Sequence, residues 1–232
     1  MSLYVLADTH LSFGTDKPMH IFPGWQDHVS RLEAAWRRLV KPEDTVVIPG
    51  DISWAMQIKD AERDLAFLHA LPGQKIIGKG NHDYWWCTMR KMQEFLDANG
   101  FDSIRFLFNN ACRVGDIAVC GTRGWFFDAQ DAEDNSKIIR REAMRLARSI
   151  EEALSLGGTP VAFMHYPVVM DGQTVEPLME VLEQFGITRC YFGHVHGDTS
   201  GRLLRFTERG ILFSLISADA LGFCPKKVLL TE

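Results

Sequence analysis

The sequence contains no apolar run that approaches the roughly 20 residues needed to span a bilayer, so we expect no membrane partner. The N-terminal residues lack a basic segment and soon reach a carboxylate at Asp8, which favours a first β-strand over a signal peptide. The five cysteines are odd in number, scattered, and never in CxxC spacing. They predict no disulfide framework and favour a reducing, cytoplasmic location.

An excess of positive charge is also absent, since 25 Lys and Arg stand against 30 Asp and Glu. Nucleic-acid binding depends on neutralising phosphates with Lys and Arg. The composition therefore disfavours nucleic acid as a partner, although it leaves a local basic groove open. Four arginines of one predicted helix alternate with glutamates and predict a solvated helix face: Arg140, Arg141, Arg145 and Arg148, with Glu142 and Glu151.

Linkers, internal repeats and low-complexity segments are absent as well, and 46% of the 232 residues are apolar. We therefore expect a single domain over residues 1–232, while the sequence indicates no oligomeric state. Short apolar runs predict strands at 3–7, 45–48, 75–78, 161–164 and 190–192. Helical periodicity is present around 25–39, 58–68, 85–96, 138–154 and 175–185.

Turn signals indicate that later strands are antiparallel. Asn109-Asn110 and Gly115-Asp116 predict hairpins, and the segment from Gly201 onward has the same character. βαβ units followed by hairpins predict an α/β fold with more than one sheet.

Potential metal ligands follow directly after five of the predicted strands: Asp8 and His10, Asp51, Asn81, His165, and His194 with His196. In open α/β sheets, ligands bind beyond the carboxyl ends of strands. Carboxylate, amide and imidazole groups without thiolate suit Mn, Fe, Zn or Ni. Seven ligands exceed what one catalytic ion needs and suit two divalent transition-metal ions about 3.5–4 Å apart, an arrangement used in phosphoryl transfer.

The same residues resemble, in order, the five motif blocks of the calcineurin-like metallophosphoesterases. The blocks are Asp8-x-His10, Gly50-Asp51, Gly80-Asn81-His82-Asp83, His165 and Gly193-His194-Val195-His196. Each block alone is more typical of a turn or a polar strand end, but five in order over residues 8–196 are specific. The resemblance implies a four-layer αββα sandwich, in which two facing mixed β-sheets are flanked by helices.

The resemblance also implies roles for these residues. Asp8, His10, Asp51 and His196 would hold one ion, and Asp51, Asn81, His165 and His194 the other, so that Asp51 bridges them. A hydroxide bridging the ions would attack phosphorus. His82 would be the catalytic histidine facing the leaving group, and Asp83 would orient it. Ile52-Ser53-Trp54 replaces the Asp-Arg-Gly of the family's protein phosphatases, and Asp83 replaces their Glu, so protein phosphatase activity is disfavoured.

Aromatic and arginine side chains near these blocks predict a substrate-binding rim made of Trp54, Tyr84, Arg123 and Trp125. Rings there would stack on a base, and Arg123 would pair with a phosphate oxygen. Trp85 is expected on a buried helix face instead. We expect a small or nucleotide-like phosphate ester as substrate, manganese among the effective ions, and phosphodiesterase activity, which short family members without a cap often have.

Three alternatives stay open at this point. The same site would serve a phosphomonoesterase or a nuclease, and the same fold also occurs in non-catalytic binding modules. Modules of that kind lose metal ligands or the catalytic histidine, whereas every expected position is filled here.

Overall fold

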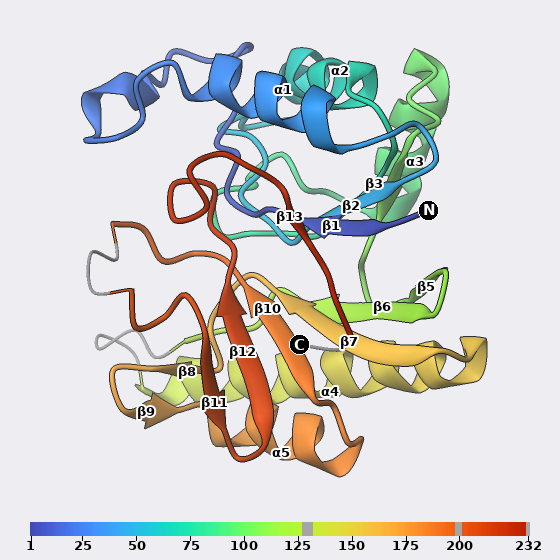
Figure 1. Cartoon of the computed structure of the whole chain (residues 1–232), viewed down its shortest axis with the longest axis vertical. Helices are drawn as coiled ribbons and strands as arrows, with labels where there is room; N and C mark the ends of the chain where they lie inside the picture. The colour runs from blue at the N-terminus through green and yellow to red at the C-terminus, as the bar shows by residue number, and fades with distance from the viewer. Residues whose placement is uncertain (127–131, 198–200, 231–232) are drawn as a thin grey trace.

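The computed structural model describes residues 1–126, 132–197 and 201–230. Two large β-sheets pack face to face, and helices cover the outer face of each (Figure 1). Helices α1, α2 and α3 lie above the first sheet in that view, while α4 and α5 lie below the second. The predicted fold class, two facing mixed sheets flanked by helices, is therefore confirmed.

The first sheet has the strand order β13-β1-β2-β3-β4. Strands β1 to β4 run parallel, and β13 pairs antiparallel with β1. The strands are β1 (Leu3–Val5), β2 (Thr45–Ile48), β3 (Gln74–Ile77), β4 (Ile104–Phe106) and β13 (Lys226–Lys227). The covering helices are α1 (His28–Leu39), α2 (Glu62–Ala70) and α3 (Met89–Asn99), with short 3-10 turns η1 (Met19–Ile21) and η2 (Ile58–Ala61).

The second sheet has the order β11-β12-β10-β7-β6-β5, and its outermost strands β5 and β11 are antiparallel to their neighbours. Its strands are β5 (Cys112–Val114), β6 (Ile117–Thr122), β7 (Thr159–Met164), β10 (Arg189–Phe192), β11 (Phe206–Glu208) and β12 (Ile211–Leu215). Outside it lie α4 (Ala132–Leu156), α5 (Glu176–Gln184) and the small hairpin of β8 (Val169–Met170) and β9 (Gln173–Thr174).

Alternation along the strands explains the layers. In β2, Val46 and Ile48 pack with the residues beneath α1 to α3, while Val47 faces the other sheet. Successive side chains of a strand point to opposite faces, so a strand that is buried along its whole length fits a sheet covered on both sides. The apolar layer between the sheets also contains Phe163 of β7 and Tyr191 of β10, whose rings stack at 5.4 Å.

Three local predictions have different outcomes. The Gly115-Asp116 hairpin is confirmed, because β5 and β6 are antiparallel across it. The Asn109-Asn110 hairpin is wrong: β4 pairs with β3 in the first sheet and β5 with β6 in the second, so this turn crosses between sheets. Trp85 is buried as expected, but α3 begins only at Met89, after the capping residue Thr88.

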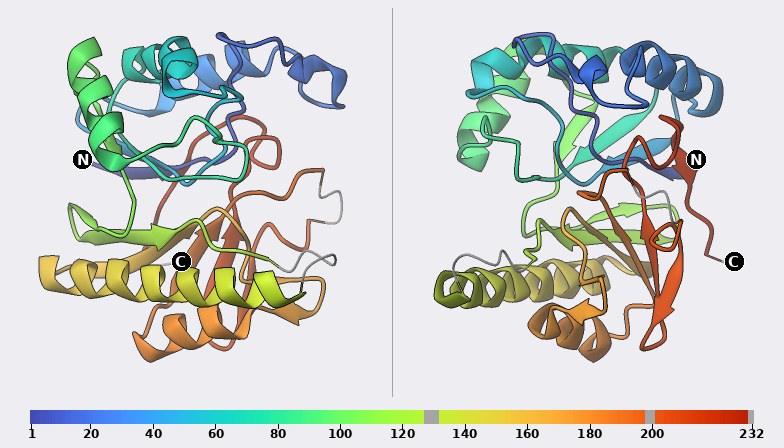
Figure 2. Two further views of the ribbon diagram at one scale, coloured as in Figure 1. Left: turned by 180° about the vertical axis from the view of Figure 1, so that it is seen from behind. Right: turned by 90° about the vertical axis from the view of Figure 1, so that its left-hand side faces the viewer.

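The loops that follow the parallel strands of both sheets gather on one side of the molecule. This side is on the left in Figure 1 and faces the viewer in the right-hand view of Figure 2. None of the helices in the described part of the chain is long and apolar enough to cross a membrane.

Candidate metal centre

All seven predicted ligands lie in the loops that directly follow β1, β2, β3, β7 and β10, and the structure brings them together. His10 Nε2 lies 3.2 Å from His196 Nε2, and His194 Nδ1 lies 2.9 Å from Asn81 Oδ1. His165 Nε2 lies 2.6 Å from the same Asn81 oxygen. Ligands held about 2.0–2.2 Å from one ion lie roughly 3 Å apart, so these spacings fit groups that share metal ions.

One carboxylate oxygen lies between the two expected halves of the site. Asp51 Oδ2 is 3.7 Å from His10 Nε2 and 3.6 Å from His165 Nε2, two histidines assigned to different ions. This position favours Asp51 as the bridging ligand. Asp8 also lies near both halves of the site. Its ligand atoms lie within 4.8 Å of those of His10 and His196 in one group, and within 4.8 Å of those of Asp51 and His165 in another.

The electrostatics of these groups also fit bound cations. Asp8 and Asp51 are buried, and among the described residues neither forms an ion pair with Lys or Arg. Burial, together with the charges of Asp8 and Asp83, raises the pKa of Asp51 to about 9. Burial also raises the pKa of Asp8 to about 6. Positive ions would supply the missing charge and restore both carboxylates to the ionised form.

Two of the ligand histidines, His10 and His165, are held in the form that binds metals. Burial and neighbouring imidazoles hold the pKa values of His10 and His165 well below the usual range, and neutral imidazole is the metal-binding form. His165 Nδ1 is buried without a hydrogen-bond partner in the described part of the chain. Such orphaned groups are uncommon in folded proteins, so this residue set fits a site completed by two ions.

The backbone at the site is strained. Nine non-glycine residues in the described ranges have positive φ, and four of them are predicted ligands: Asp8, His10, Asp51 and His194, at 58°, 44°, 51° and 71°. Side chains with a Cβ rarely adopt this region. Such strain persists where the surroundings enforce it, typically at functional sites. The strain therefore marks the same loops that the sequence singled out.

Two glycines beside the ligands are required by close approach. A Cβ at Gly80 would overlap Asp51 Oδ1, and a Cβ at Gly193 would lie 2.5 Å from Asp8 Oδ2. Both contacts are shorter than real Cβ atoms show, so only glycine lets these loops pass so close to the carboxylates.

Asp83 has a role that differs from the one implied by the resemblance. Its buried carboxylate accepts hydrogen bonds from the backbone N–H groups of Asp51, Ile52, Ser53 and Gly80, at 2.9, 2.9, 3.3 and 2.7 Å. It also accepts one from Trp85 Nε1 at 2.9 Å. None of these bonds reaches the His82 ring, whose Nδ1 has no partner among the described residues. The expectation that Asp83 orients His82 is therefore wrong: Asp83 ties the loop after β2 to the loop after β3.

His82 lies at the boundary between the ligands and solvent. Its backbone N–H donates to Asp51 Oδ1 at 2.8 Å, and its half-buried ring is 5.7 Å from the His10 ring and 4.4 Å from Trp54. Burial lowers its pKa, and the charges of His196 and Lys17 lower it further.

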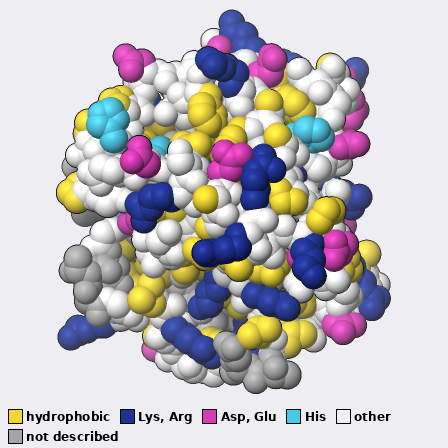
Figure 3. Space-filling view, turned by 45° about the horizontal axis from the view of Figure 1, so that its top comes forward, with side chains coloured by type: hydrophobic (Ala, Val, Ile, Leu, Met, Phe, Trp, Pro, Cys, Tyr) yellow, Lys and Arg dark blue, Asp and Glu magenta, His cyan; other side chains and the backbone are white. Residues whose placement is uncertain are grey.

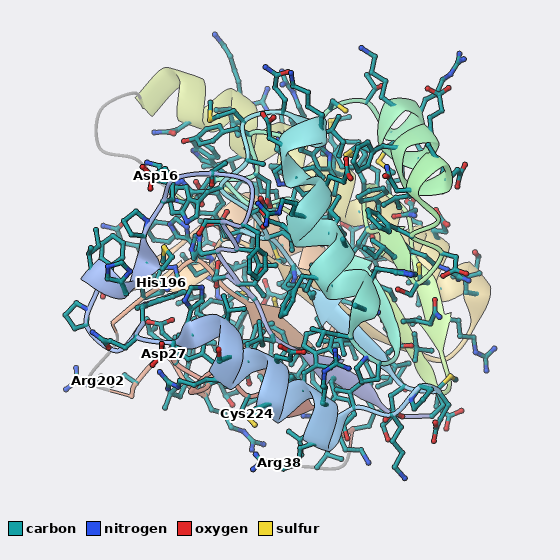
Figure 4. The ribbon with its side chains drawn as sticks, turned by 90° about the horizontal axis from the view of Figure 1, so that it is seen from above. Asp16, Asp27, Arg38, His196, Arg202 and Cys224 are labelled. Carbon is teal, nitrogen blue, oxygen red and sulfur yellow. The ribbon has the colours of Figure 1, made fainter. Side chains whose placement is uncertain are left out.

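A cavity of about 500 Å³ opens over this side of the site. Its lining is mostly apolar and includes His10, Met19, Phe22, Pro23, Trp25, Trp54, His82, His196, Gly197 and Asp219. Figure 4 shows His196 beside the N-terminal segment that carries Asp16 and Asp27, and the His196 ring lies 5.6 Å from that of Trp25. The N-terminal segment thus forms one wall of a cavity whose floor is the metal centre.

The four predicted rim residues lie on two sides of the ligands. Trp54 stacks on His10 at 5.0 Å, and the exposed Tyr84 ring lies 6.2 Å from His82. On the other side, the Arg123 guanidinium lies 4.9 Å from the Trp125 ring centre. Trp125 in turn packs on Tyr166 at 5.3 Å, and Tyr166 lies 4.2 Å from the His194 ring.

The sequence interpretation missed Asp219 and Trp25. Asp219 accepts a hydrogen bond from His196 Nδ1 at 2.9 Å and one from Gly197 N–H at 3.0 Å. Burial lowers the pKa of His196, but the hydrogen bond to Asp219 and the charges of Asp8 and Asp219 outweigh it and raise the pKa. Asp219 follows β12, so the strand-end rule could have identified it. Trp25 was assigned to a helix stripe, but α1 begins only at His28.

Comparison with known proteins agrees with this geometry. The family model for calcineurin-like phosphoesterases matches residues 1–198. Phosphopantetheinyl hydrolase from Mycobacterium tuberculosis is 11% identical with a TM-score of 0.54, over 99% of this chain and 96% of that one. The protein TT1561 of Thermus thermophilus is 12% identical with a TM-score of 0.56, over 98% and 99%. No curated protein sequence matches the chain closely enough to count as a relative.

Proposed function

The chain belongs to the calcineurin-like phosphoesterase family and is a metal-dependent hydrolase of phosphoester bonds, and we propose that it cleaves a small, nucleotide-like phosphodiester with two bound transition-metal ions. The observation that supports this most is the convergence of seven oxygen and nitrogen ligands from five strand ends around Asp51. The ions are Mn, Fe, Zn or Ni, with manganese the first to test.

In this proposal Asp8, His10, Asp51 and His196 hold one ion, and Asp51, Asn81, His165 and His194 hold the other. Bound ions supply Lewis acidity, which activates water near neutral pH and neutralises charge on the phosphoryl oxygens. Asp219 fixes the His196 ring through Nδ1, so that Nε2 faces His10 and the ion.

His82, in its imidazolium form, donates a proton to the leaving oxygen and becomes neutral imidazole. Its Nδ1 is buried, so the exchangeable proton is the one at Nε2. The ring lines the apolar cavity and lies beside the ligands, which is where a leaving group would be. General acids of this kind contribute roughly 10²–10⁴-fold to the rate.

The apolar cavity favours a substrate with an aromatic or apolar group. Trp54 and Trp25 both line it, and each lies within 6 Å of the His10 ring, at 5.0 and 5.6 Å between ring centres. A base or similar ring placed there would stack beside the phosphorus, with stacking of roughly 1–3 kcal/mol per base.

The alternatives receive less support. A nuclease would want a continuous basic surface, whereas 25 Lys and Arg stand against 30 Asp and Glu in this chain, and side chains of both signs share the face in Figure 3. A non-catalytic module would lack ligands or His82, and all of these positions are filled. Only the substrate test below distinguishes phosphomonoesterase activity from phosphodiesterase activity.

Two further parts of the proposal concern the whole chain. We infer that residues 1–232 act as one domain, because strands of both sheets contribute to the apolar layer between them. We also infer a cytoplasmic location, since all five cysteines are free.

The test is hydrolysis by protein loaded with Mn²⁺. Bis(p-nitrophenyl) phosphate should be cleaved faster than p-nitrophenyl phosphate, and elemental analysis should find about two ions per chain. Asp51→Asn should lose both metal and activity. Asp102→Asn, whose side chain is 92% exposed, is the matched control and should retain both. Full activity in excess chelator would refute the metal-dependent reaction, and faster cleavage of the monoester would refute the phosphodiester preference.

A further inference from the structure

A second, smaller cavity of about 230 Å³ lies beside the Arg123 loop and is lined by several charged residues. Its lining includes Lys79, Arg123, Arg145 and Glu142, together with Trp86 and Phe108. Lys79 directly precedes the Gly80-Asn81 ligand loop. The carbonyl oxygen of Arg123 accepts hydrogen bonds from the backbone N–H groups of His165 and Tyr166, at 3.2 and 2.9 Å. The cavity is therefore adjacent to the metal centre, on the side of Arg123 and Trp125.

Among the described lining residues Glu142 is the single carboxylate, and it is already engaged. Glu142 is buried and accepts hydrogen bonds from the Thr122 hydroxyl, from the Gly124 N–H at 3.2 Å and from Arg145 Nη1 at 2.5 Å. Glu142 thus fastens the loop that carries Arg123 to α4 and neutralises Arg145. The predicted solvated face is wrong for these two residues, because Glu142 is buried and Arg145 is half-buried against the Phe108 ring at 5.5 Å.

Two cations in the cavity have no counter-ion among the described residues. Neither Lys79 nor Arg123 forms an ion pair in the part of the chain that the structure describes. Both are half-buried, so water screens their charges less than at an open surface. The Arg123 guanidinium is held over the Trp125 ring, and this contact leaves its N–H edge available to an oxyanion. With Arg145 neutralised by Glu142, the described lining of the cavity carries a net positive charge.

We propose that this cavity is a second anion subsite, in which Lys79 and Arg123 bind an additional phosphate or carboxylate group of the substrate. The inference rests on the proposed function, because it places the reacting phosphoryl group at the metals and the additional acidic group in this cavity. The apolar cavity on the opposite side of the site would take the aromatic or apolar group. The favoured substrate class is then a phosphate ester that carries a further anionic group.

Binding of unreactive probes to the Mn²⁺-loaded protein tests the subsite without catalysis. Isothermal titration would compare propylphosphonate with alkane bisphosphonates of increasing length. At least one bisphosphonate should bind about tenfold more tightly or better, since charge-assisted hydrogen bonds are the strong ones. The Lys79→Met, Arg123→Met double variant should lose this preference. Arg141→Met, which removes an exposed cation of the same helix as Arg145, is the control and should keep it.

The outcomes separate this inference from the proposed function. Equal binding of every bisphosphonate and propylphosphonate by the wild-type protein, or a preference that survives in the double variant, would overturn the subsite. Inorganic phosphate is the probe for a free-anion site: if it binds the metal-free protein and the double variant loses that binding, the cavity holds free phosphate instead. Absence of hydrolysis of every ester would overturn the proposed function alone, because the titrations would still decide the subsite.

Discussion

Replacing Asp83 by asparagine tests the role that the structure assigns to this carboxylate. Oδ1 accepts from Ile52 N–H, Ser53 N–H and Trp85 Nε1, and Oδ2 accepts from Asp51 N–H and Gly80 N–H. The amide of asparagine retains one acceptor oxygen and places an NH₂ group where the other oxygen was. In the better of its two orientations, this NH₂ group faces the two N–H donors that bonded to Oδ2, and both are left without an acceptor. At about 1–3 kcal/mol for each unsatisfied group, Asp83→Asn should lower the free energy of unfolding by about 2–6 kcal/mol.

That loss is large against the roughly 5–15 kcal/mol that stabilises a typical domain. It should be measured by urea unfolding of metal-loaded protein, because in metal-free protein relief of repulsion with Asp51 offsets part of it. Metal affinity should fall too, since the bonds to Asp51 and Gly80 position the ligand loops. Asp44→Asn is the control: that buried carboxylate also accepts two backbone N–H bonds, from Ser2 and Lys41, but at the start of β2.

The control should lose stability and keep its metal affinity. A different result would refute the reasoning about Asp83. If Asp83→Asn unfolds within about 1 kcal/mol of wild type and binds metal equally well, but loses activity, then the carboxylate acts on His82 and not on the loops.

Four further outcomes are expected. His82→Ala should keep its metals and lose roughly 10²–10⁴-fold in rate on esters with poor leaving groups, and an equal loss on nitrophenyl esters would contradict the proton donation. Gly80→Ala should bind metal weakly, because its Cβ would overlap Asp51 Oδ1; wild-type metal content by elemental analysis would contradict this. Trp54→Ala should raise KM, reflecting roughly 1–3 kcal/mol of lost stacking, with metal content unchanged. Burial lowers the pKa of Lys75 to about 8 in the folded protein, whereas in the unfolded chain it is about 10.4. Between about pH 8 and 10 the unfolded chain therefore binds more protons than the folded protein, so the free energy of unfolding should rise with pH over this range. Lys75→Met should remove that rise.

The sequence determined much of the ligand set, because the rule that connects sequence to site is local. Each of the predicted ligands directly follows a strand, and strand position can be read from apolar runs such as 45–48. The order of βαβ units likewise determined the parallel core of the first sheet. Asp219, which bonds to His196, also follows a strand, β12, so the same rule applies to it and the sequence contains the information needed to identify it.

Other features depended on contacts between segments far apart in the chain. The Asn109-Asn110 turn has the local chemistry of a hairpin, but the pairing of β4 with β3 makes it a crossover between sheets. Arg145 has the spacing of a solvated helix face, but the loop after β6 packs on α4 and buries Glu142 beneath it. The secondary-structure propensity of a segment depends on its own residues and does not include packing against distant segments.

The division between the two sources of information is clearest at Asp83 and at the two cavities. The sequence by itself determined which residue types lie at the strand ends, because the periodicity of a strand and the glycines that end it are local properties of the sequence. Only the tertiary structure decided that Asp83 bonds to the 51–53 loop, that Trp25 joins the apolar cavity and that Lys79 faces the same cavity as Arg123. These contacts join residues from separate strand ends, and their geometry is set by how the sheets pack against each other and against their helices.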